Sequence, residues 1–136
     1  MKLTIAPEMT IAAVQDSFQT AFPHLKLVFF THPHKAFKGS PAQYLIQDRH
    51  LLLGSLEKQP ASGVLYLEGD MPTWQVERLF EEEYGLHVQV FRKSGNTWLE
   101  TSVTDSLSLE QQEAKGLAGD NIHFEFVDPI DYREQD

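Results

Sequence analysis

An internal repeat constrains the fold of this chain more tightly than any other feature of its sequence. The segment Leu3–Met9 aligns with Leu65–Met71, which lies 62 positions later, and the same offset places Phe18 on Phe80. After a slip of one residue, the segment 25–29 aligns with the segment 86–90. Because a duplicated supersecondary unit fixes an architecture more firmly than local propensity does, the two copies should share one structure.

Each copy reads as a strand, an acidic turn, a helix and a second strand. Both helical segments carry apolar residues at spacings of three and four, which is typical of a helix lying on a sheet. These residues are Ile11, Val14, Phe18, Ala21 and Phe22 in the first copy, and Val76, Leu79, Phe80 and Tyr84 in the second. Thr10 suits an N-cap, Pro72 suits a first helical turn, and Gly85 suits a helix end. The pattern predicts an α+β fold in which two pseudo-repeated β-α-β units form a ferredoxin-like sandwich.

The length of 136 residues favours a single domain spanning residues 1–136. Within it we assign repeat copy 1 to residues 1–30, a linker region to 31–62, repeat copy 2 to 63–92 and a C-terminal extension to 93–136. In the linker we expect a loop over 31–40 and a short helix over 41–47. Periodicity does not decide whether residues 51–54 form a strand or a helix.

The C-terminal extension predicts an added hairpin, a short helix and a strand. Lys93–Asn96 is a turn signal, because Gly95 adopts a positive φ without steric strain. Ser108 and Gln111 match a capping box, and Gly116 or Gly119 would end the polar helix that follows. The segment 121–127 alternates apolar and polar residues and should form a closing strand, followed by a frayed tail.

Composition and charge exclude several classes of function. The chain has no cysteine, which excludes disulfides, thiolate metal sites and cysteine catalysis. Residues 1–60 have a net charge of +2 and residues 61–136 a net charge of −11. An acidic surface repels phosphate backbones, so we expect no nucleic-acid partner. The sequence shows no signal peptide and no apolar run long enough to span a membrane, so we expect a cytoplasmic protein without a membrane partner.

The hairpin offers the sharpest candidate surface. A turn centred on Ser94 and Gly95 would place Phe91 opposite Trp98 and Gln89 opposite Glu100 on a polar face, with basic residues at the tip. Aromatic rings beside arginine are typical anchors of protein interfaces. The alternative is that both rings are covered by the C-terminal helix or by the loop before Ser40. The predicted binding residues are Phe91, Trp98, Arg92, Lys93, Gln89 and Glu100.

The sequence gives weaker signals for a metal site or a catalytic site than for an interaction surface. His32 and His34 could share a metal only with a third ligand, which no sequence spacing supplies. A group of His87, Glu100 and Asp105 lacks the nucleophile and oxyanion features of a hydrolase. No phosphate-binding glycine motif is present, and we predict no cofactor and no metal.

The sequence resembles no family of known function, and the favoured function is a non-catalytic protein-interaction or self-association module. Its partner would be another protein or a second copy of the chain. The alternative is a small-molecule or metal-assisted enzyme with a site between the sheet and the loop, using either His32 and His34 or the group around His87. Enzymatic activity therefore stays open, with its absence favoured.

Overall fold

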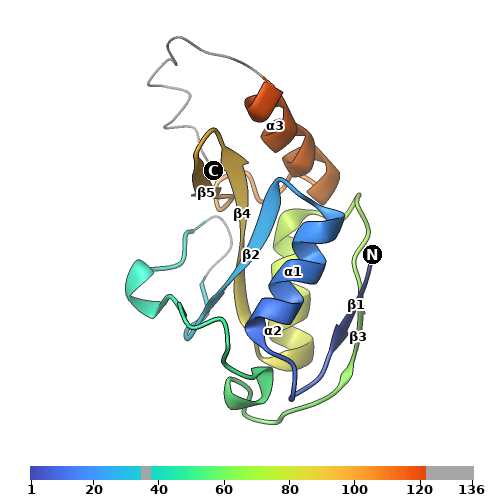
Figure 1. Cartoon of the computed structure of the whole chain (residues 1–136), viewed down its shortest axis with the longest axis vertical. Helices are drawn as coiled ribbons and strands as arrows, with labels where there is room; N and C mark the ends of the chain where they lie inside the picture. The colour runs from blue at the N-terminus through green and yellow to red at the C-terminus, as the bar shows by residue number, and fades with distance from the viewer. Residues whose placement is uncertain (35–37, 122–136) are drawn as a thin grey trace.

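The computed structural model describes residues 1–34 and 38–121, and these form a mixed α+β fold (Figure 1). The strands are β1 (Lys2–Ile5), β2 (Leu25–Phe30), β3 (Gly63–Tyr66), β4 (His87–Ser94) and β5 (Thr97–Glu100). The helices are α1 (Ile11–Ala21), α2 (Thr73–Tyr84) and α3 (Leu109–Asn121). The predicted order of strand, helix and strand therefore occurs twice, followed by the predicted hairpin and helix. Each described helix is too short or too polar to span a membrane.

The described strands form two separate antiparallel sheets. β1 pairs with β3, with Leu3 opposite Leu65, and the second sheet has the order β2-β4-β5, with Val28 opposite Gln89. In Figure 1, α1 lies between the two sheets. A ferredoxin-like sandwich is not confirmed, because its strands would share one sheet, whereas here the first strands of the two units pair apart from the second strands.

One hydrophobic core is formed by residues of α1, α2 and both sheets. α1 contacts β1 and β2, while α2 contacts β4. The largest side chains that are almost fully buried include Phe18 of α1, Phe29 of β2 and Phe80 of α2, with Phe29 and Phe80 packed edge to face at 6.3 Å between ring centroids. Burying these rings supplies a large apolar area, which makes the pairing of helices with sheets favourable.

Three of the predicted helix ends are confirmed. The Thr10 hydroxyl accepts a hydrogen bond from the Ala13 amide at the start of α1. Gly85 ends α2 with a φ of 65°, a left-handed conformation that costs glycine little. Ser108 and Gln111 form the reciprocal capping box at the start of α3.

The linker and the extension differ in part from expectation. The predicted helix over 41–47 is only a short 3-10 helix at Ala42–Tyr44, and another, at Leu53–Ser55, begins within the undecided segment 51–54. α3 continues through both glycines that were expected to end it. Gly116 packs so closely on His24 that an added Cβ would lie 2.6 Å from the His24 Cβ, so this glycine serves close packing rather than termination. Asn121 belongs to α3, and the rest of the predicted closing strand and the tail lie outside the described residues.

Candidate functional site

The hairpin keeps its predicted faces but not its predicted register. Ser94 lies opposite Thr97, so Lys93 rather than Phe91 lies opposite Trp98, and Glu100 lies opposite Phe91. The turn consists of Gly95 and Asn96, one residue later than expected, which shifts the pairing by two. Because an even shift preserves the alternation of side chains, Phe91 and Trp98 still share a face as diagonal neighbours.

Two of the six predicted binding residues are buried. Arg92 is 6% exposed, and its Nη1 donates to the Gln112 Oε1 of α3 at 2.8 Å, so it does not form part of an exposed basic tip. Gln89 is fully buried and donates through Nε2 to the Glu77 carboxylate of α2 at 2.9 Å. Both side chains hold elements of the fold together, because a buried polar group must find a partner.

The other four predicted residues are partly exposed. Glu100 accepts a hydrogen bond from the Ser40 backbone, and burial raises the pKa of this carboxyl. The Lys26 Nζ of β2 lies over the Trp98 ring, 4.7 Å from its centroid, a cation–π geometry. Lys26, Phe91, Lys93 and Trp98, which share the face of the sheet turned away from α1 and α2, are called here the lysine–aromatic patch.

His32 and His34, the two loop histidines, contact different parts of the structure. His32 stacks on the Tyr44 ring at 3.9 Å between centroids. His34 instead reaches β4, where its Nε2 lies 3.2 Å from the Val88 carbonyl oxygen and 3.7 Å from the Glu77 Oε1. Over the parts of the chain that the structure describes, no cluster of three or more His, Cys, Asp or Glu side chains is arranged to hold a metal ion.

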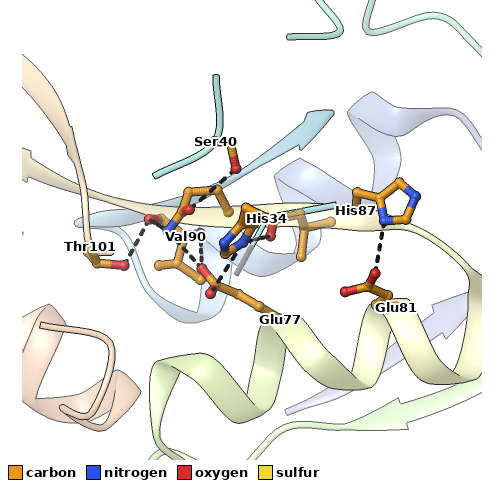
Figure 2. Close-up of polar contacts among 9 residues, drawn as sticks. His34, Ser40, Glu77, Glu81, His87, Val90 and Thr101 are labelled. Carbon is orange, nitrogen blue, oxygen red and sulfur yellow. Dashed lines mark hydrogen bonds and ion pairs between the residues drawn. The ribbon is translucent and has the colours of Figure 1, made fainter. Parts of the chain in front are cut away.

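The side chain that organises this region is Glu77, which sequence analysis did not identify as a site residue. It projects from α2 to the edge of β4, where His34 lies over it (Figure 2). The pairing of β5 with β4 reaches Phe91 and goes no further. At the preceding residue of β4, the Val90 amide donates to the Glu77 Oε2 at 2.8 Å. The Thr101 amide and hydroxyl both donate to the Val90 carbonyl at the same point. Glu77 and Thr101 thus provide hydrogen-bond partners for the Val90 amide and carbonyl at the point where β5 no longer pairs with β4.

Burial makes the Glu77 carboxyl an unusually weak acid. Desolvation, reinforced by the negative charges of Asp105 and Glu100, raises the pKa of Glu77 to about 8, against the opposing hydrogen bond from Val90. The carboxyl is therefore largely protonated at neutral pH. A strongly perturbed carboxyl beside an imidazole is a recognised mark of a functional site.

A pocket of about 540 Å³ opens beside Glu77. It lies between α2, the edge of β4 and the loop at His34, and its walls include Trp74, Glu81 and His87. The His87 Nδ1 lies 3.4 Å from the Glu81 Oε1, and burial lowers the pKa of this imidazole despite that neighbour. The volume falls in the range of small-molecule sites.

The sequence did carry one signal for Glu77. Thr73, Val76, Glu77 and Phe80 are all buried on α2, at the three- and four-residue spacings of one helical face. A glutamate within such a stripe must be paired or neutral, because burying an isolated carboxylate is costly. The triplet Glu81–Glu83, which follows directly, is by contrast a charge run typical of the solvated side of a helix.

The chain matches no protein-family model, and neither a curated protein nor a solved structure matches it. Its chemistry is therefore inferred from its own contacts. The Glu77 carboxyl can hold a proton at the floor of the pocket, and the partly exposed rings of the lysine–aromatic patch can enter an interface.

Proposed function

We propose that this protein is a non-catalytic, cytoplasmic interaction module that binds a protein partner through the lysine–aromatic patch. The observation that carries the proposal is the arrangement of Trp98, partly exposed and covered on one side by the Lys26 ammonium, with Phe91 and Lys93 beside it. Large aromatic rings with a flanking cation are the side chains that most often dominate interface energies.

The charge of the patch points to the chemistry of the partner. The chain as a whole has a net charge of −9, yet the patch carries two lysines, and the neighbouring carboxyl of Glu100, opposite Phe91 on the same face, accepts a hydrogen bond from the Ser40 backbone. A partner segment with an acidic residue next to an apolar one would pair its carboxylate with Lys26 or Lys93 and pack its apolar side chain on Trp98. Such complementarity steers association and makes it sensitive to salt.

Affinity capture from the source cells tests this proposal. Wild type, Trp98→Ala and Tyr66→Ala proteins are compared, where Tyr66 is a matched control because it is 61% exposed on the other sheet. A specific partner should be retained by wild type and Tyr66→Ala, identified, and then titrated. We expect Trp98→Ala to weaken its binding about tenfold or more, as for a central interface aromatic.

Two outcomes would contradict the proposal. One is a specific partner that Trp98→Ala retains as tightly as wild type. The other is a Trp98 emission that resists aqueous quenchers in a Trp74→Phe background, where Trp98 is the remaining tryptophan. Concentration-dependent dimerisation that Trp98→Ala abolishes would replace the acidic partner with a second copy of the chain.

We also propose that the two strand–helix–strand units are copies of one ancestral unit. The sequence repeat equates Leu3 with Leu65 and, after the one-residue slip, Val28 with Gln89. These equated residues lie directly opposite one another, the first pair across β1 and β3 and the second across β2 and β4. Agreement between an alignment and a strand register supports duplication, since each was obtained without the other.

A further inference from the structure

The pocket beside Glu77 is separate from the lysine–aromatic patch and has a different character. Its floor is the Glu77 carboxyl, which is 6% exposed, and one wall is the Trp74 ring. Glu81 and His87 form the opposite side, where the His87 Nδ1 lies 3.4 Å from the Glu81 Oε1. A concave site that combines an aromatic wall with a few converging polar groups is typical of ligand binding.

Charge decides which class of ligand fits. Glu77, Glu81 and Glu82 line the pocket, and the negative charges of Asp105 and Glu100 act on Glu77 from behind. Arg78, the cationic side chain in the lining, pairs with Glu82 at 3.4 Å and lies over the Trp74 ring. With Glu77 protonated at neutral pH, Glu81 and Glu82 still outnumber Arg78 in the lining, and ionisation of Glu77 adds a further negative charge. The field in the pocket is therefore negative, which disfavours an anion and favours a cation.

Size and ligand geometry narrow the class further. A volume of about 540 Å³ is far larger than a bare metal ion requires, and the described side chains hold no three-ligand metal cluster. An alkyl ammonium group fits better, because its stem can pack on Trp74 while its N–H donors meet carboxylates. An aromatic face next to carboxylates is a recurrent way to bind such cations.

We propose that this pocket binds the terminal ammonium of an alkyl amine, with the charged end between Glu77 and Glu81 and the aliphatic stem against Trp74. The same chemistry is offered by a free diamine and by a lysine side chain of another protein. The proposal goes beyond the interaction surface on the hairpin and does not depend on it.

Binding of a cation at Glu77 should release a proton. The neutral carboxyl must ionise to pair with the ammonium, so affinity should rise with pH until Glu77 is already ionised in the free protein. The groups that face Glu77 are His34 from the loop, His87 from β4, Arg78 and Glu81 from α2, and Glu100 and Asp105 from the hairpin and the segment after it. Protonation of His87 at low pH would add positive charge and weaken binding in the same direction.

Calorimetric titration of the full chain with 1,5-diaminopentane tests the proposal. We expect saturable binding whose affinity rises by up to about tenfold per pH unit between pH 6 and 8, with proton release detected as a dependence of the heat on buffer ionisation. Nα-acetyl-lysine amide forms the second arm, and the tighter of the two amines identifies a free amine or a lysine side chain as the source. Glutarate and 1,5-pentanediol, which match the length of the diamine, should not bind.

Variants separate the site from general charge effects. Glu77→Gln should weaken diamine binding at pH 8.5 by roughly 10- to 100-fold, the loss expected for a charge-assisted hydrogen bond, and should flatten the pH dependence. Glu68→Gln removes the same charge at an exposed position outside the pocket and should bind as wild type. If Glu77→Gln does not fold, Glu81→Gln on the helix surface replaces it, with a several-fold loss expected. Absence of amine binding at millimolar concentration, equal binding of glutarate, or wild-type affinity in the folded pocket variant would overturn the proposal.

Discussion

Replacing Glu77 with glutamine should change the way stability depends on pH. The glutamine amide resembles the protonated carboxyl in shape and charge, and its oxygen can accept the Val90 amide in place of the Glu77 Oε2. It cannot ionise. At pH 5, where the Glu77 side chain of the folded protein is neutral, we expect the two proteins to differ in stability by about 1 kcal/mol or less, as for an interaction that is replaced by a similar one.

The sign of the effect follows from the two pKa values of the carboxyl. In the unfolded chain the pKa of Glu77 is close to the ordinary value of 4.5, and in the folded protein it is about 8. The folded state therefore holds a proton that the unfolded state releases between these two values. Wild-type stability contributed by this group is fully present below pH 4.5, falls as pH rises towards 8, and is constant above it.

The magnitude follows from the separation of the two values. One pH unit corresponds to about 1.4 kcal/mol, so the interval from 4.5 to about 8 amounts to about 5 kcal/mol over the full range. Between pH 5 and pH 8.5, where both ends of the curve flatten, we expect the free energy of unfolding of wild type to drop about 4 kcal/mol more than that of Glu77→Gln.

Urea unfolding of both proteins at half-unit steps of pH measures this difference directly, because all other titrating groups are common to the two. Glu83→Gln, an exposed substitution on the same helix, is the control and should follow wild type throughout. Parallel pH profiles for wild type and Glu77→Gln would refute the reasoning, since they would mean that Glu77 has the same proton affinity in the folded and unfolded chains.

Two further predictions concern α3. Gln112→Ala removes the Gln112 Oε1 that accepts from the buried Arg92 and should lower the free energy of unfolding by about 1–3 kcal/mol in urea titrations, whereas a change below about 0.5 kcal/mol would argue against a structural role for this contact. Gly116→Ala should destabilise by about 1–3 kcal/mol because its Cβ would crowd His24, while Gly119→Ala, with nothing within 4 Å of the added Cβ, should stabilise by up to about 1 kcal/mol in thermal unfolding. Equal effects of the two alanine substitutions would contradict the packing described for α3.

The sequence predicted the elements well where a single local signal decides the outcome. The Thr10 cap, the end of α2 at Gly85 and the capping box at Ser108 each depend on one side chain or one glycine within a few residues of the helix end. Leu25, Leu27 and Phe29 alternate along β2, and all three are buried. The class, α+β, follows from these elements.

Non-local choices were not predictable in the same way. The hairpin register depends on which two residues form the turn, and Gly95 suits either of the first two positions, so the pairing was misplaced by two residues. Arg92 and Gln89 are residue types that usually lie on the surface. They are buried here because α3 packs against Arg92 and α2 packs against Gln89. The arrangement of the sheets required knowledge of long-range pairing between β1 and β3, to which local periodicity is blind.

The register of the two sheets has a consequence for fragments of this chain. In both sheets the residues that the sequence repeat equates lie opposite one another, Leu3 with Leu65 and Val28 with Gln89. The duplication proposed above would relate the two halves by an approximate dyad. A polypeptide of residues 63–92 alone would contain β3 and most of β4 without their partners β1 and β2. Each of these strands could then pair with the same strand of a second polypeptide in antiparallel orientation. We expect two such polypeptides to form a homodimer with an isologous interface that restores both strand pairings. In the full-length chain, the two units that form these pairings are covalently linked.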